Sequence, residues 1–262
     1  MNRIEHKFKE LKRGNKKAFI AFITAGYPDL STTKKLIIKF AQAGVDIIEL
    51  GVPFSDPLAD GPVIQEASQE ALKKNTHLAA IIKLVGRVRK SVSIPICLMT
   101  YYNPVFCFGK EKFIREALRN GVDGVIIPDL PPEEDVPFVK AAAKSGLDLI
   151  CFLSPTSTVE RMKFISKVSR GFIYYVSLTG VTGARKALSP DIKKNIRFIK
   201  KYTNKPVCVG FGVSTYAQVK EAGRVSDGVI VGSAIIKKIK DNLGKRDLIK
   251  KVASFVRGLT RV

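Results

Sequence analysis

The feature that most constrains the fold is a short apolar run that recurs along the chain. Its four clearest copies are AGVDIIELG (43–51), NGVDGVIIPD (120–129), SGLDLICFLS (145–154) and VSDGVIVGS (225–233). In three copies a glycine (Gly44, Gly121 or Gly146) follows a helical pattern, as residues just beyond a helix C-terminus commonly do. The run that follows shows no polar alternation, which is typical of a parallel strand buried on both faces. The chain is therefore predicted to consist of repeated strand–helix units.

The same rhythm predicts eight strands, at 17–24, 46–51, 94–99, 123–127, 148–153, 172–176, 206–210 and 227–231. Helices are expected between and after them, near 31–43, 62–74 with 77–90, 110–120, 133–145, 159–169, 189–203, 215–222 and 234–258. Eight such units in one uninterrupted run favour a closed (β/α)₈ (TIM) barrel, as a single domain over residues 1–262. A doubly wound open sheet is the alternative, but its GxGxxG fingerprint is missing after the first strand. Ile4, Phe8 and Leu11 share one helical face, which predicts a short extra N-terminal helix.

The formal net charge of +22 is the unusual feature of the composition. Such a charge suits nucleic-acid binding, because phosphate neutralisation dominates that interaction. The lysines and arginines are nevertheless scattered over most predicted helices, and no arginine–aromatic cluster of the kind that reads bases occurs. We therefore expect a solvated, lysine-rich surface and no nucleic acid as the primary ligand. No apolar run approaches the roughly 20 residues of a membrane span, so no membrane segment is predicted.

The cysteines and the N-terminus bear on the compartment. Cys97, Cys151 and Cys208 lie inside predicted strands, Cys107 lies in a predicted loop, and their spacing is not that of a metal site. Free buried thiols are typical of a reducing compartment. The charged segment 1–17 has no apolar stretch of the kind found in signal peptides. A cytoplasmic location is therefore expected.

The barrel architecture sorts the acidic residues, because barrel enzymes carry their chemistry at the carboxyl ends of the strands. Four aspartates start predicted strands and are expected to be structural: Asp46, Asp123, Asp148 and Asp227. Four other carboxylates end a strand or follow one, and are expected at the active end: Glu49, Asp56, Asp60 and Asp129.

Acid–base chemistry is expected to depend on carboxylates. His6 and His77 both fall in helical segments, which excludes a histidine triad or a histidine metal site, and no strand ends in the lysine of a Schiff-base aldolase. Glu49 lies in the apolar run DIIELG, where desolvation would raise its pKa as a proton shuttle requires, provided that it faces the barrel mouth. A glutamate turned outward is equally compatible with its position. Asp60 lies in SDPLADGP, where turn chemistry or a helix N-cap is the alternative.

Two glycine–serine loops predict a phosphate site. The seventh strand ends in GFGVST (210–215) and the eighth in VGSAI (231–235). Small residues between a strand and a helix allow backbone N–H groups to converge on an anion, and this pair of loops is the usual phosphate cradle of the fold. Ordinary tight turns are the alternative. After the sixth strand, SLTGVTGARKALS (177–189) predicts a lid, with an ordinary loop as the alternative.

Several segments together resemble the family of tryptophan synthase α subunits. The most specific is ELGVPFSDPLADGPVIQEAS (49–68). The others match in family order: FITAGYPD (22–29), LMTYYNPVF (98–106), IIPDLPPEE (126–134), SPTST (154–158), SLTGVTGAR (177–185) and GFGVS (210–214). The resemblance covers essentially the whole chain. Tyr27 stands where relatives often carry aspartate, at a variable position.

The resemblance implies retro-aldol cleavage of indole-3-glycerol phosphate to indole and glyceraldehyde 3-phosphate, with no cofactor and no metal. It implies that Glu49 is the acid–base residue, that Asp60 stabilises positive charge at the indole N–H, and that Tyr174 is also catalytic. The implied substrate-binding residues are Phe22, Tyr101, Ile127, Thr182 and Phe211, with Thr182 meeting Asp60 when the lid closes. The implied phosphate-binding residues are Gly183, Gly212, Val213, Gly232 and Ser233.

The resemblance also implies a partner, the β subunit of an α₂β₂ heterotetramer, which itself carries pyridoxal phosphate. The implied contact residues are Pro53, Asp56, Asn103, Pro104, Pro131 and Pro132. Three alternatives stay open: a stand-alone indole-3-glycerol-phosphate lyase, another phosphate-binding barrel enzyme of an amino-acid pathway, and a non-enzymatic nucleic-acid binder.

Overall fold

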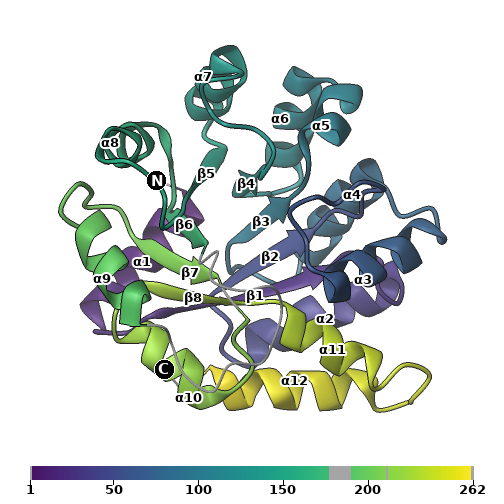
Figure 1. The fold of residues 1–262 in the computed structure, drawn as a ribbon. Coiled ribbons are helices and arrows are strands. Elements are labelled where there is room, and N and C mark those ends of the chain that lie inside the picture. The colour runs from purple at the N-terminus through teal and green to yellow at the C-terminus, as the bar shows by residue number, and fades with distance from the viewer. Residues whose placement is uncertain (1, 177–189, 211, 261–262) are drawn as a thin grey trace.

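Eight parallel strands close into a barrel that is surrounded by helices (Figure 1). The computed structural model describes residues 2–176, 190–210 and 212–260. Each strand pairs with the next, and the last pairs with the first. The strands are β1 (Ala18–Thr24), β2 (Ile47–Gly51), β3 (Ile96–Met99), β4 (Gly124–Ile126), β5 (Asp148–Leu153), β6 (Ile173–Val176), β7 (Val207–Gly210) and β8 (Gly228–Val231). The predicted TIM barrel is confirmed, and every strand lies within the segment predicted for it.

The helices of the described residues follow the strands in the expected alternation. They are α1 (Arg3–Arg13), α2 (Leu30–Gln42), α3 (Pro62–Leu72), α4 (Leu78–Val88), α5 (Tyr102–Phe108), α6 (Lys110–Arg119), α7 (Val136–Ser145), α8 (Val159–Val168), α9 (Pro190–Ile199), α10 (Tyr216–Gly223), α11 (Ser233–Lys240) and α12 (Leu248–Leu259). In the part of the chain that the structure describes, no helix combines the length and the apolar character needed to cross a membrane.

Two helical features differ from the sequence-based expectation. The short helix α5 was not predicted, because its sequence contains Pro104. This proline stands in the first turn of α5, where a backbone N–H has no partner within the helix, so the helix tolerates it. The segment near 234–258, predicted as one helix, forms α11 and α12. Gly244 between them has a φ of 73°, a left-handed conformation in which helices commonly end.

Helix α1 closes the amino-terminal end of the barrel. Its residues Ile4, Phe8 and Leu11 are buried on one face, as predicted. They pack against the inward-facing side chains of the lower barrel: Ile20, Ile47, Cys97, Ile126, Ile150, Phe172, Cys208 and Ile230. Asn2 caps the helix, and its Nδ2 donates a hydrogen bond to the carbonyl of Asp123 at 2.7 Å. The open end of the barrel is therefore the carboxyl end of the strands.

The four aspartates at strand starts are structural, as expected. Three of them tie their strand to the preceding one by accepting a backbone N–H: Asp46 from Phe19 at 2.8 Å, Asp123 from Ile96 at 2.8 Å and Asp227 from Val207 at 2.9 Å. Asp148 pairs with Arg170 at 3.5 Å. The three cysteines predicted in strands are buried, and Cys107 is exposed. The amino-terminal end thus holds the barrel together and leaves its opposite end for function.

Candidate active site

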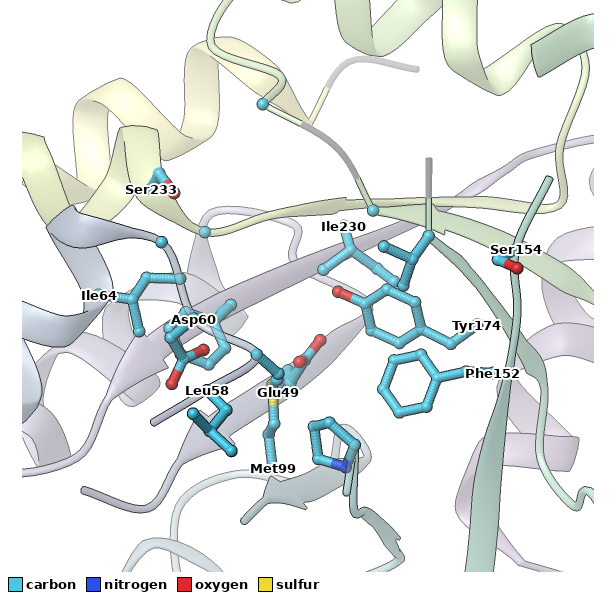
Figure 2. A pocket seen from close by; sticks show the side chains of 18 of the residues that line it. Glu49, Leu58, Asp60, Ile64, Met99, Phe152, Ser154, Tyr174, Ile230 and Ser233 are labelled. Carbon is cyan, nitrogen blue, oxygen red and sulfur yellow. The ribbon is translucent and has the colours of Figure 1, made fainter. Parts of the chain in front are cut away.

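A cavity of about 810 Å³ opens at the carboxyl ends of the strands (Figure 2). One part of its lining is apolar: Phe22, Leu58, Ile64, Met99, Phe152 and Ile230. Two carboxylic acids and a phenol project into the same space: Glu49, Asp60 and Tyr174. A mostly apolar cleft with a few convergent polar groups is the usual form of a small-molecule site.

Two glycines make room for the aromatic rings of this cavity. A Cβ atom at Gly51, the last residue of β2, would lie 2.6 Å from Cζ of Phe22. A Cβ atom at Gly210, the last residue of β7, would lie 2.5 Å from Cε1 of Tyr174. Real Cβ atoms do not approach other atoms so closely. The strands therefore end in glycine where an aromatic ring lies against the barrel wall.

Glu49 is a buried acid without a counter-charge. It stands on β2, in register with Phe22 of β1, and only 1% of its surface is exposed. Neither of its carboxylate oxygens has a hydrogen-bond partner among the described residues. Burial, with a smaller contribution from the charge of Asp60, raises the pKa of Glu49 to about 8. The side chain lines the cavity, so the outward orientation that the sequence left open is excluded.

Asp60 is held by its surroundings in the loop between β2 and α3. The Tyr101 hydroxyl donates a hydrogen bond to Oδ2 of Asp60 at 3.1 Å and accepts one from the Ala59 N–H at 3.1 Å. The Phe54 ring stacks on Tyr101 with 5.2 Å between centroids. Burial raises the pKa of Asp60 to about 6, and the bond from Tyr101 opposes that rise. Helix α3 starts after Gly61 without a side-chain cap, so Asp60 is not its N-cap.

The two carboxylic acids therefore differ in ionisation. Near pH 7 the higher pKa keeps most of Glu49 protonated, while the lower pKa leaves most of Asp60 ionised. Environments that separate the pKa values of two acids commonly assign them different catalytic roles. The described residues contain no group of three or more His, Cys, Asp or Glu side chains that could hold a metal ion.

Tyr174 supplies a neutral hydroxyl. Its ring is tilted against Phe152 with 4.9 Å between centroids. Burial, followed by the charges of Glu49 and Asp60, raises the pKa of Tyr174 well above its ordinary value. The phenol therefore stays protonated at physiological pH and can act as a hydrogen-bonding group beside Glu49 (Figure 2).

The other predicted substrate residues divide into three groups. Phe22 lines the cavity. Among the described lining residues, Tyr101 and Ile127 are absent: Tyr101 reaches the cavity only through Asp60, and Ile127 is buried in the core. Thr182, Gly183 and Phe211 lie outside the described residues, as does the predicted lid (177–189).

The predicted phosphate residues Gly212, Val213, Gly232 and Ser233 line one side of the cavity. Helix α11 begins at Ser233 directly after Gly232, and its N-cap makes no side-chain hydrogen bond. Helix α10 differs, because Thr215 and Gln218 form a capping box at its start. The N–H groups of an uncapped helix start are suited to an anion. The geometry therefore points to α11, rather than α10, as the helix that receives it.

Sequence reasoning missed one wall of the cavity, formed after β5 by Ser154, Ser157 and Arg161. Ser154 directly follows the strand, so the strand-end rule had a signal for it. Arg161 lies in the first turn of α8, where nothing in the sequence distinguishes it from a surface arginine. Phe152 and Ile230 were also missed, because an apolar strand does not reveal which of its residues point inward.

The predicted partner-contact residues lie on three loops beyond the strand ends. Asp56, Asn103 and Pro131 are exposed, and Pro104 is half-buried. Pro53 and Pro132 are buried within the chain, so they shape their loops rather than offer side chains to a partner. On two of these segments large apolar side chains are exposed: Leu58 at 80% and Phe106 at 59%.

Known proteins resemble this chain over its full length. The profile of the family "Tryptophan synthase alpha chain" matches residues 8–261. The tryptophan synthase alpha chain of Thermoanaerobacter sp. (strain X514) is 46% identical, with 100% of both chains covered. That of Geotalea daltonii is 48% identical over 99% of this chain and 98% of the relative.

Solved structures agree with the sequence relatives. Tryptophan synthase subunit alpha from Legionella pneumophila str. Paris superposes with a TM-score of 0.93 and 36% identity, covering 99% of this chain and 97% of that one. A chain of tryptophan synthase from M. tuberculosis, in its aminoacrylate-bound form, gives 0.89 and 30%, covering 99% and 98%. Sequence and barrel thus agree from end to end, and the chain belongs to the tryptophan synthase alpha chain family.

Proposed function

We infer that this chain is the α subunit of a tryptophan synthase, a carbon–carbon lyase that cleaves indole-3-glycerol phosphate to indole and glyceraldehyde 3-phosphate. The full-length family match supports the assignment. The observation that carries it is the pair of carboxylic acids facing one cavity, with the pKa of Glu49 near 8 and that of Asp60 near 6.

The proposed reaction needs one acid that gives and regains a proton. Protonated Glu49 donates its proton to C3 of the indole ring, which places positive charge on the ring nitrogen. The resulting Glu49 carboxylate takes the proton of the hydroxyl on the side-chain carbon next to C3. The bond between that carbon and C3 then breaks, its electrons restore the aromatic indole, and the carbon becomes the aldehyde. Glu49 ends protonated, so it can act again.

Asp60 has a different part, for which it must be ionised. Its carboxylate accepts a hydrogen bond from the indole N–H and stabilises the charge that appears there after protonation of C3. Tyr174, held neutral beside Glu49, provides a hydrogen-bonding hydroxyl. Phe22 and the other apolar side chains of the cavity suit the indole ring. Near pH 7 the two acids already have the ionisation states that the first step requires.

The phosphate group is proposed to bind at the start of α11. Gly232 and Ser233 bring the uncapped helix start to the cavity, and Gly212 and Val213 add backbone from the neighbouring loop. The helix dipole favours an anion at this point. Sequence analysis named the same residues together with Gly183, which lies outside the described residues.

Titration with inorganic phosphate or glycerol phosphate should shift the backbone amide NMR signals of Gly212 and Gly232. The expected cause is direct N–H donation to the phosphate oxygens. Gly146, at the end of α7 near Asn2 at the closed end of the barrel, is the matched control and should not move. Unmoved signals at both Gly212 and Gly232 under saturating ligand would contradict this phosphate site.

A tryptophan synthase β subunit is the proposed partner, in an α₂β₂ assembly, and pyridoxal phosphate is proposed to belong to that partner. The exposed Leu58 and Phe106 lie on or next to the loops of Asp56 and Asn103, and so offer apolar contact area beside the cavity mouth. Large exposed apolar side chains are commonly interaction surfaces. A cytoplasmic location accords with this assembly and stays a prediction.

Release of indole from indole-3-glycerol phosphate, measured with and without a β subunit, tests the whole assignment. We expect slow release by the chain alone and faster release with the β subunit, because docking beside the mouth would order the loops that carry Asp60. Full activity that a β subunit leaves unchanged would identify a stand-alone lyase instead. No indole under either condition would refute the proposed function.

A further inference from the structure

The cavity contains a cation that the proposed reaction does not use. Among the described residues that line it, Arg161 is the only cationic side chain. Its backbone is fixed in the first turn of α8, where the Arg161 N–H donates to Oγ1 of Thr158 at 3.2 Å. Its guanidinium binds the carboxylate of Glu133, from the loop between β4 and α7. Both side chains are partly exposed, at 31% and 45%.

The position of this cation differs from that of the proposed phosphate site. Ser154 belongs to the same wall as Arg161, and it lies across the cavity from Ser233 (Figure 2). A phosphate at the start of α11 would therefore not sit on the wall of Arg161. The α11 site consists of backbone N–H groups, whose attraction for an anion falls off within about one helical turn. A full charge acts over a longer distance, limited by a Debye length of about 10 Å at 0.1 M salt.

The local charge balance explains why one arginine would matter. The chain as a whole has a net charge of +22, yet its cavity holds the carboxylic acids Glu49 and Asp60. A phosphorylated ligand entering the mouth meets the ionised Asp60, which repels it. A cation in the lining offsets this repulsion where the ligand passes. Glu133 partly neutralises that cation while the cavity is empty.

We propose that Arg161 guides phosphorylated ligands into the cavity and helps to retain them there, taking no part in proton transfer. The proposal rests on the proposed function for the identity of the ligand. Arg161 is thus a positioning residue, since its guanidinium does not lose its proton in proteins and cannot act as the acid or base. The competing explanation is a tether, in which the ion pair merely fixes α8 to the β4–α7 loop.

The reverse reaction separates charge from shape, because it combines neutral indole with anionic glyceraldehyde 3-phosphate. Arg161→Gln should raise the KM for glyceraldehyde 3-phosphate and lower kcat/KM for indole-3-glycerol phosphate, each by about three- to tenfold at low salt. The KM for indole and the kcat values should stay within about twofold. Arg161→Lys should recover most of the loss. The difference between Arg161→Gln and the unmodified chain should shrink as salt is added.

Two further variants distinguish guidance from the tether and from net charge. Glu133→Gln breaks the same ion pair but leaves the cation, so guidance predicts an unchanged or lower KM for glyceraldehyde 3-phosphate. A tether predicts the same damage as Arg161→Gln. Lys163→Gln removes an exposed charge from the same helix outside the cavity lining and should have no effect. A loss in Glu133→Gln or in Lys163→Gln as large as that in Arg161→Gln would overturn the proposal.

A binding measurement keeps this test independent of catalysis. Calorimetric titration with glycerol 3-phosphate should give a Kd about three- to tenfold weaker for Arg161→Gln than for the unmodified chain, converging at high salt. Equal Kd values at low salt would overturn the guiding role even if the lyase activity stands. Tight phosphate binding that depends on Arg161, without any indole formation, would instead refute the proposed reaction and leave the guiding role intact.

Discussion

Glu49→Gln should lower the rate of indole release by about 10²–10⁴-fold, which is the usual contribution of general acid–base catalysis. Glutamine keeps the size and hydrogen-bonding capacity of the side chain, but it can neither give a proton to C3 nor take one from the hydroxyl. Binding of the substrate should change little, because the cavity and the α11 helix start are unaltered. Retention of most of the activity would place the proton shuttle on another residue.

The pH profile should carry the signature of the same residue. Glu49 must be protonated for the first step, so activity should fall as the pH rises through about 8. Asp60 must be ionised, so activity should fall as the pH drops through about 6. The profile is therefore a bell with its maximum near neutrality. Whatever rate remains in Glu49→Gln should lack the alkaline limb.

Burial of Glu49 also affects stability, in the opposite direction from a salt-bridged acid. The pKa of Glu49 is about 8 in the folded chain and near the ordinary 4.5 in the unfolded chain. Between these values the folded state holds a proton that the unfolded state has lost, so the free energy of unfolding falls as the pH rises through this window. Glutamine does not titrate. Glu49→Gln should therefore lose less stability than the unmodified chain between pH 5 and pH 8, as urea unfolding would show.

Asp60→Asn should slow indole release by about 10²–10³-fold, similar to the loss of one electrostatic group from a preorganised site. Asparagine still offers a carbonyl oxygen to the indole N–H, but it has no charge to balance the cationic ring. Asp60→Glu should be more active than Asp60→Asn, because it restores a carboxylate. Equal rates for these two variants would show that charge at this position is not what the reaction uses.

Tyr101→Phe is the graded companion of that experiment. The Tyr101 hydroxyl lowers the pKa of Asp60 by its hydrogen bond, so its removal should raise that pKa further above 6. The acidic limb of the pH profile should then move toward neutrality, with more activity lost near pH 6 than near pH 8. A limb that stays in place would mean that Asp60 does not produce it.

Much of the barrel is readable in the sequence because burial on both faces leaves a local mark. A parallel strand covered inside and outside is a run of apolar residues without alternation, and all eight runs became strands. The leading helix was readable from the single buried face formed by Ile4, Phe8 and Leu11. Helix α5 and the break at Gly244 were not, because both depend on backbone conformations that periodicity does not reveal.

The roles of the site residues came from family resemblance, and the geometry adds what resemblance does not specify. The sequence placed Glu49 at the end of a strand, but an apolar strand gives no indication of which face points inward. Closure of the barrel decides it: Ile47 belongs to the inner cluster, so Glu49, two residues later, points inward as well.

By itself, then, the sequence determined the strands, the closed end and the position of the acids near the mouth, since each depends on residues close together in the chain. Only the tertiary structure decided that Tyr101 holds Asp60, that α11 rather than α10 has the open helix start, and that Arg161 lines the cavity. Each of these depends on groups far apart in the chain or on hydrogen bonds formed only in the fold. Side chains brought together by barrel closure leave no periodic pattern in the sequence.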